Sequence, residues 1–181
     1  MEANEAQELQ EHAEHGAHEP SMRPVAFTMS VLAVLVAVTT VLGHRTHTEA
    51  VLNQDKATDQ WNEYQAKKIR AYDTQLTEDL LKVVVVPDKE ASAKITQAYD
   101  KHLEKWNDDL KEDQEKAEAL QEKVEQAEAR ANRYDLGEAL LEIALVITSV
   151  TLLTRSRIYW YAGLAASVVG IVSVATGLLL K

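Results

Sequence analysis

The sequence predicts an all-α membrane protein with three transmembrane helices and a long antiparallel helical hairpin, of the coiled-coil type, between the first and second spans. Three observations lead to this prediction. The 181 residues contain three apolar stretches, a charged stretch between the first and second of them, and only six glycines and three prolines for turns. So few turn residues argue against an all-β fold, which needs many connections.

The overall charge and the missing cysteines exclude several classes of function. The formal net charge is −10 and there is no cysteine. An acidic chain lacks the basic patch that nucleic-acid binding requires, so we expect no nucleic-acid partner. Without cysteine there are no disulfides, thiolate nucleophiles, cysteine-ligated zinc sites or iron–sulfur clusters.

The three predicted spans are residues 25–43, 136–154 and 158–180. The first and third contain no charged side chain, and the second contains only Glu138 and Glu142, near its start. A helix needs about 20 apolar residues to cross a hydrocarbon core of roughly 30 Å. Buried helices of a soluble protein are the alternative, which we disfavour because little other apolar sequence could surround them.

Residues 1–24 form an acidic tail that contains histidines at positions 12, 15 and 18. Its six glutamates give it the wrong charge for a cleavable signal peptide, so we expect the first span to be an uncleaved anchor. Imidazoles beside carboxylates suit zinc, nickel or copper, which makes His12, His15 and His18 candidate metal ligands. The alternative, which we favour, is a flexible polar tail without a metal; no other cofactor is expected.

Residues 44–135 are predicted to form the hairpin, with its turn at residues 87–88, where Pro87 ends the first arm. The second arm carries an apolar seam in alternating steps of four and three, which is typical of a coiled coil. Its members are Tyr99, Leu103, Trp106, Leu110, Asp113, Ala117, Leu120, Val124, Ala127, Ala131 and Tyr134. A looser seam in the first arm comprises Ala57, Trp61, Tyr64, Lys68, Tyr72, Leu76, Leu80 and Val83.

Stripes of small residues in the first and third spans predict close helix packing, either within the chain or between copies. Lipid gives helices no hydrophobic reason to associate, so close backbone approach has to hold them together. The packing candidates are Ala26, Ser30, Ala33 and Ala37 in the first span, and Gly163, Ala166, Gly170, Ser173 and Gly177 in the third. If the stripes join copies, Gly170→Leu should lower the oligomeric state.

Four polar residues are predicted to cluster where the first span ends and the second begins: His44, His47, Glu138 and Glu142. An ionisable group inside a span is a functional candidate. One interpretation is an ion pair or hydrogen bond between Glu142 and a nearby histidine or arginine, which only fixes helix register. The other is a path for protons, ions or a metal. We favour the first.

No sequence motif of a hydrolase, nucleotide-binding protein, zinc protease or calcium-binding loop is present, so we do not expect an enzyme. The favoured function is a membrane scaffold or accessory subunit that assembles as a homo-oligomer or with other membrane subunits. The alternative is an oligomer that handles ions, protons or metal through the four-residue cluster.

The chain resembles a family of bacterial membrane proteins described only as domain of unknown function 4337. The resemblance rests on the acidic histidine-containing tail, on Gly43-His44-Arg45, on Trp61-x-x-Tyr64-Gln65-Ala66-Lys67 and on the paired C-terminal spans. It implies a bacterial inner membrane and no particular site residues. Arg23, Arg155 and Arg157 favour a cytoplasmic tail, which leaves the hairpin periplasmic.

Overall fold

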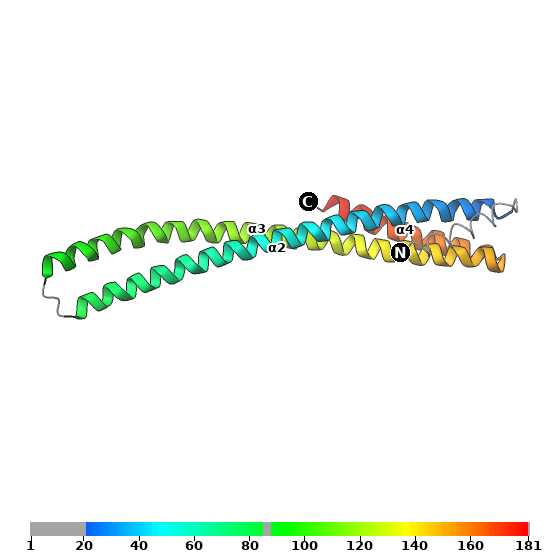
Figure 1. Cartoon of the computed structure of the whole chain (residues 1–181). Helices are drawn as coiled ribbons and strands as arrows, with labels where there is room; N and C mark the ends of the chain where they lie inside the picture. Colours follow the sequence, from blue (N-terminus) through cyan, green and yellow to red (C-terminus); the bar gives the residue numbers. More distant parts are fainter. Residues whose placement is uncertain (1–20, 85–87, 181) are drawn as a thin grey trace. The chain divides into compact units, whose positions relative to one another are not determined.

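The computed structural model describes residues 21–84 and 88–180, and over these ranges it contains three α-helices and no strand. Helix α2 (Arg23–Val83) has 61 residues, α3 (Lys89–Thr154) has 66 and α4 (Arg157–Leu179) has 23 (Figure 1). The all-helical part of the predicted fold class is therefore confirmed. The predicted metal ligands His12, His15 and His18 and the predicted turn residue Pro87 lie outside the described residues.

The helix ends follow from local sequence. Pro24 is the second residue of α2. Its missing N–H costs no hydrogen bond there, because the N–H groups of the first helical turn have no partner within the helix. Asp88 caps α3, because its Oδ1 accepts hydrogen bonds from the backbone N–H groups of Glu90 and Ala91 at 3.1 and 3.0 Å. Between α3 and α4, Arg155 has a φ of 56°, in the left-handed region that commonly ends a helix.

The chain divides into two compact units. The apolar unit comprises the described residues up to Ala50 and those from Glu125 onward, and the polar unit comprises residues 51–124. All of α4 therefore lies in the apolar unit, whereas α2 and α3 each contribute a segment to both units.

The core of the apolar unit lies between α2 and α3. Its buried members are Met29, Leu32, Val36, Leu141, Ala144 and Leu145. The three helices are long and apolar enough to cross a membrane. Large apolar side chains also cover their outer surfaces, among them Phe27, Val34, Leu153, Val168 and Leu179. An apolar exterior around an apolar core is what a lipid environment requires.

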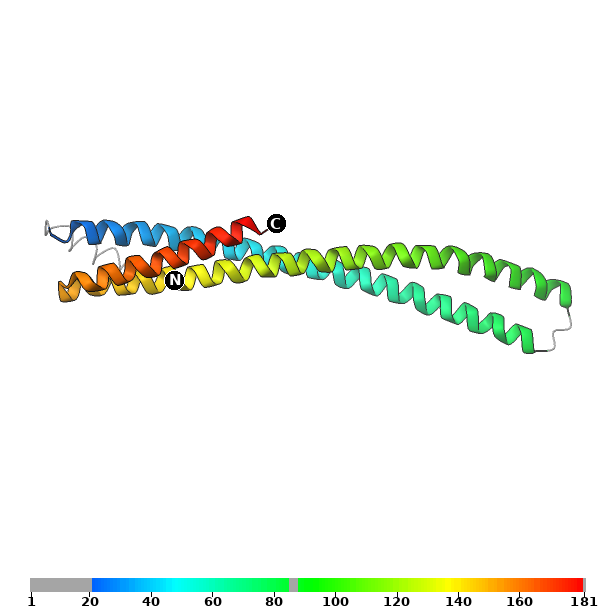
Figure 2. The ribbon, with the colours of Figure 1, turned by 180° about the vertical axis from the view of Figure 1, so that it is seen from behind.

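Helix α4 lies beside α3, and its small residues form the contact (Figure 2). Gly163, Gly170, Ser173 and Gly177 are buried and Ala166 is half-buried. A Cβ atom added to Gly170 would lie 3.0 Å from Leu141 Cγ and 3.1 Å from the Gly137 carbonyl oxygen. The stripe in the third span is thus an intrachain packing surface, as one of the two interpretations of the sequence predicts.

The stripe in the first span is placed differently. Ala26 is buried and Ala33 half-buried, but Ser30 and Ala37 are exposed. Larger side chains, such as Met29 and Val36, occupy the face of α2 that packs on α3. Ser30 and Ala37 therefore do not take part in packing within this chain, where longer side chains fill the contact, and their packing against another copy stays a prediction.

In the polar unit, the α3 seam is shielded as predicted. Asp113, Ala117 and Val124 are buried, and the remaining seam residues of this unit are half-buried (Tyr99, Leu103, Trp106, Leu110 and Leu120). The positions between them are mostly exposed and charged. A constant alternation of steps of three and four therefore keeps one face of α3 shielded over the whole segment.

The predicted α2 seam is correct in its first half and wrong in its second. Ala57 is buried, and Trp61, Tyr64 and Lys68 are half-buried. Beyond them the predicted members Tyr72, Leu76, Leu80 and Val83 are exposed, and the shielded positions are Ala71, Thr74, Glu78 and Leu81. Steps of four overshoot a full turn by about 40° each, so the large apolar residues rotate away from the shielded face.

Candidate functional site

Polar side chains join α2 to α3 in the apolar unit, and they make up the candidate site. The hydroxyl of Thr40 donates to Glu138 Oε1 at 2.5 Å. Further along α2, His47 Nε2 lies 3.0 Å from Asp135 Oδ2. Next, Arg130 donates from its guanidinium to Glu49 at 2.9 Å. Later residues of α2 meet earlier residues of α3, so the two segments run antiparallel in this unit.

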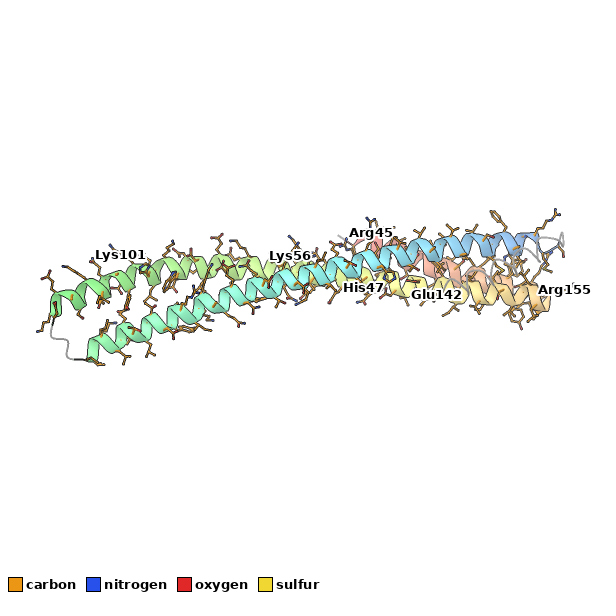
Figure 3. The ribbon with its side chains drawn as sticks, viewed as in Figure 1. Arg45, His47, Lys56, Lys101, Glu142 and Arg155 are labelled. Carbon is orange, nitrogen blue, oxygen red and sulfur yellow. The ribbon has the colours of Figure 1, made fainter. Side chains whose placement is uncertain are left out.

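These contacts differ in strength because they differ in exposure. The Thr40–Glu138 bond is partly buried and charge-assisted, which is the stronger kind of hydrogen bond. The side chains of His47 and Asp135 are 53% and 49% exposed, so solvent screens their attraction. Figure 3 shows His47 and Arg45 on opposite edges of α2, so only His47 is turned toward its α3 partner.

The predicted cluster of four residues is divided by the structure. Glu138 and His47 each bond across to the other helix, but to Thr40 and Asp135 rather than to each other. His44 is exposed and Glu142 is half-buried, and within the described ranges neither side chain makes a hydrogen bond or ion pair. The predicted pairing of Glu142 with His44 or Arg45 is therefore absent from this part of the chain.

The register of the helices explains this correction. A Cβ atom added to Gly43 would lie 3.5 Å from Asp135 Oδ1 and 3.9 Å from Glu138 Oε2, so Gly43 is level with Asp135 and Glu138. Glu142 lies one helical turn, or about 5.4 to 6 Å, farther along α3. Glu138, rather than Glu142, is thus the carboxylate that reaches α2, where it accepts the hydrogen bond of the Thr40 hydroxyl.

Sequence reasoning missed Gly43, Asp135, Glu49 and Arg130. Gly43 is buried and faces Tyr134 and Asp135 of α3, where an added Cβ atom would be in ordinary van der Waals contact. Asp135 directly follows Tyr134, the last member of the predicted α3 seam. Continuing the seam by steps of four and three reaches Glu138 and Leu141 but none of these four residues, so the pattern of α3 alone carries no signal for them.

The other interhelical hydrogen bonds in the apolar unit fix α4. The hydroxyl of Ser173 donates to the carbonyl oxygen of Arg133 at 2.9 Å. At the other end of α4, the indole N–H of Trp160 donates to Thr28 Oγ1 at 3.2 Å. Trp160 belongs to an aromatic group at the start of α4, and its ring also contacts that of Tyr161. Each bond satisfies a polar group between two helices.

A second polar site lies in the polar unit, at the one acidic position of the α3 seam. Asp113 is buried, and its carboxylate accepts hydrogen bonds from Lys67 Nζ at 2.5 Å and from Gln60 Nε2 at 3.4 Å. Glu63 also contacts Lys67, at 2.9 Å. Hydrogen bonds to Asp113 and then to Glu63 raise the pKa of Lys67 well above its ordinary value. A raised pKa means that this stabilisation is complete below pH 10.5 and is lost only as the pH rises above it.

A groove of about 540 Å³ adjoins this ion pair within the polar unit. Its apolar walls are Ala71 of α2 and Leu103 and Leu110 of α3. Its other walls are polar or aromatic: Tyr64, Lys68, Tyr72, Gln75, Asn107, Lys111 and Gln114.

The chemistry of both sites is that of structural hydrogen bonds and ion pairs. Among the described residues, no group of three or more histidines and carboxylates is close enough to hold a metal ion. The carboxylates that join two helices, Glu138, Asp135, Glu49 and Asp113, face a hydroxyl, an imidazole, a guanidinium and an ammonium group, respectively, and these contacts orient one helix against the other.

The two glutamates of the second span make a matched pair for mutation. Replacing Glu138 with alanine should lower the free energy of unfolding by about 1–2 kcal/mol, because Thr40 loses a charge-assisted partner. Glu142→Ala should leave stability unchanged or raise it, since an unpaired carboxylate is removed from an apolar stretch. Thermal unfolding of both variants in the same detergent would measure the difference. An equal or larger loss for Glu142→Ala would mean that Glu142 has a partner.

The fold and the sites define an all-helical protein whose three helices can each cross a membrane and are joined by structural polar contacts. Residues 21–180 match the family model described as a domain of unknown function, DUF4337. The chain belongs to this family, as the resemblance noted in its sequence indicates. No curated protein and no solved structure matches the chain.

Proposed function

We propose that the protein is a non-enzymatic, integral membrane scaffold or accessory subunit that assembles as a homo-oligomer or within a larger membrane complex. In this proposal α2, α3 and α4 each cross the bilayer once, and residues 44–135 form an extramembrane coiled-coil hairpin. The observation that carries it is the continuity of α2 and α3, whose apolar segments run without a break into charged segments. In this proposal each of the two helices therefore supplies one segment that crosses the membrane and one charged segment outside it.

The setting that we propose is the inner membrane of a bacterium. Arg23, Arg155 and Arg157 flank the spans on the side of the N-terminal tail, and short loops rich in arginine face the cytoplasm. The tail and the turn at Arg155 would therefore be cytoplasmic, and the hairpin periplasmic. Partners would then be lipid, further copies of the chain and other membrane subunits.

Purification from native membranes tests the scaffold function. The full chain, extracted in mild detergent, should elute as an oligomer or with a second membrane protein in constant stoichiometry, as measured by native mass spectrometry. A wash at high salt serves as the control, since it removes adventitious charge contacts from an acidic chain. A monomer without a stoichiometric partner would contradict the proposal.

The second candidate function, the handling of ions, protons or metal, is favoured by one observation: Glu142 is half-buried and unpaired within the described residues. Intramembrane carboxylates often serve proton or ion paths. Purified protein in liposomes would then give a proton or cation flux that Glu142→Gln abolishes and Glu138→Gln does not. The scaffold function predicts no flux for either variant or for the wild type.

A further inference from the structure

The second half of α2 carries an apolar ridge that nothing in the described part of the chain covers. We name it the α2 ridge and define it by Ile69, Tyr72, Leu76, Leu80 and Val83. Their exposed fractions are 60%, 59%, 60%, 52% and 78%. A row of five large apolar side chains in a polar segment is unusual for a surface that faces only water.

The α2 ridge is centred on the face of α2 that is turned away from α3, and Tyr72 lies at its edge, where it also lines the groove shared with α3. Lys67 points toward α3, where it pairs with Asp113, and the buried Ala71 and Glu78 share its face. At about 100° per residue, the centre of the ridge is roughly opposite these three positions. The ridge therefore cannot be covered by α3 in the arrangement that the Lys67–Asp113 pair fixes.

The ridge has the spacing of a helix-packing surface. Its members follow one another in steps of three, four, four and three. Steps of three, four and four make an 11-residue repeat, which keeps an apolar stripe nearly parallel to the helix axis. A straight stripe of this kind fits against another helix over its whole length.

The flanks of the ridge carry opposite charges at positions from which they would meet the flanks of a second, parallel copy. Lys68 immediately precedes Ile69, and Asp73 immediately follows Tyr72. In two parallel helices packed through such a ridge, the residue before the first ridge position faces the residue five places later on the neighbour. Lys68 of one copy would then face Asp73 of the other, and symmetry would supply the same pair twice.

These groups are available for such a pair. Asp73 is exposed, and its carboxylate makes no hydrogen bond or ion pair within the described ranges. Lys68 is half-buried; its Nζ donates a hydrogen bond to the Tyr64 hydroxyl at 3.2 Å and lies 5.2 Å from the centre of the Tyr64 ring and 6.0 Å from that of Tyr72, which holds it beside the ridge. Its contact with Tyr64 and Tyr72 leaves the ammonium without a carboxylate partner in the described chain.

We infer that the α2 ridge binds the α2 ridge of a second copy of this chain, with the two helices parallel. The inference rests on the proposed membrane function, because two copies inserted in one membrane must extend their polar units to the same side. It deepens that function by naming the surface through which copies associate. A self-complementary ridge with a self-complementary charge pair fits a two-fold symmetric interface.

Disulfide cross-linking tests this interface directly, since the chain contains no native cysteine. Single substitutions Ile69→Cys, Leu76→Cys and Val83→Cys in the full chain, oxidised in membranes with copper phenanthroline, should each give a covalent dimer. Thr77→Cys is the matched control, because Thr77 is exposed and next to Leu76 but points about 100° away from the ridge centre. We expect at least a fivefold higher dimer yield at the ridge positions. Equal yields at Thr77→Cys and Leu76→Cys would overturn the inference.

Charge reversal gives a second readout on the Leu76→Cys background. Lys68→Asp should lower the dimer yield several-fold by placing like charges opposite each other, and adding Asp73→Lys should restore it. Helical circular dichroism of each variant confirms that the chain still folds. No recovery in the double variant would contradict the parallel arrangement.

Native mass spectrometry of the wild type separates failure of this inference from failure of the proposed function. An oligomer without cross-linking at the ridge overturns the ridge interface alone. A monomer without any stoichiometric partner overturns both. The inference is also overturned if the ridge cysteines do not cross-link but are shielded from maleimide by a membrane or by another protein. In that case a different surface covers the ridge.

Discussion

Replacing Gly163 with leucine should break the contact between α3 and α4. A Cβ atom at this position would lie 2.9 Å from the carbonyl oxygen of Ala144 and still closer to the hydroxyl of Thr148. The first of these atoms is backbone, which cannot move without shifting α3. Overpacking of this kind costs about 3 kcal/mol, and larger losses follow when backbone has to move. Thermal unfolding in detergent, followed by circular dichroism, measures the loss.

Ala162→Leu is the matched control for this change. Ala162 is exposed and precedes Gly163 directly, so the same side chain is added one position away without a clash. It should change the free energy of unfolding by less than about 0.5 kcal/mol. If both variants melt alike, Gly163 is not at a close helix contact.

Gly170→Leu should behave in the same way, and this differs from the expectation based on sequence alone. Its Cβ would meet Leu141 and the Gly137 backbone of the same chain. The variant should therefore lose stability as a monomer, and a specific change of oligomeric state is no longer expected from this position.

Replacing Lys67 with methionine should destabilise the polar unit by about 2–3 kcal/mol, because the carboxylate of Asp113 is left buried without its charged partner. The side chain of Asp113 is only 7% exposed, so water cannot replace the lost ammonium group. Chemical unfolding at pH 7 measures the effect. The double variant Lys67→Met, Asp113→Leu should recover most of the loss, since no buried charge remains.

Lys116→Met is the control for the Lys67 variant. Lys116 pairs with Glu112 at 2.7 Å, but the two side chains are 54% and 66% exposed. Its removal should cost less than about 0.5 kcal/mol, as is usual for surface pairs on one helix. A double variant as unstable as Lys67→Met alone would show that packing, rather than an uncompensated charge, accounts for the loss.

Sequence patterns predict well in this protein which segments are helical and which face of a helix is shielded, because both depend only on the spacing of residues along one helix. The α3 seam around Asp113 is an example, and the stripe through Gly163 on α4 is another. In the second half of α2 the sequence pattern predicts the wrong face, because it selects large apolar residues such as Leu76 for the contact with α3. The structure places the small Ala71 and the polar Glu78 there instead.

Contacts between elements were harder to predict, because they depend on the register of two helices. Glu138 and Glu142 lie one turn apart, so an error of one turn changes which carboxylate meets Thr40. A single glycine such as Gly137 forms no repeating pattern in the sequence, yet the backbone of α3 at Gly137 lies close to the backbone of α4 at Gly170. Such pairs emerge only when the positions of both helices are known.

If α2, α3 and α4 each cross a lipid bilayer, as we propose, the start of α3 and the turn before α4 lie on opposite sides of it. Lys89→Cys and Ser156→Cys introduce one thiol at each of these places in a chain without cysteine. A membrane-impermeant maleimide applied to intact spheroplasts should label Lys89→Cys, and it should label Ser156→Cys only after permeabilisation. Labelling of both thiols to the same extent before permeabilisation, or release of the protein from membranes by alkaline carbonate, would contradict the claim.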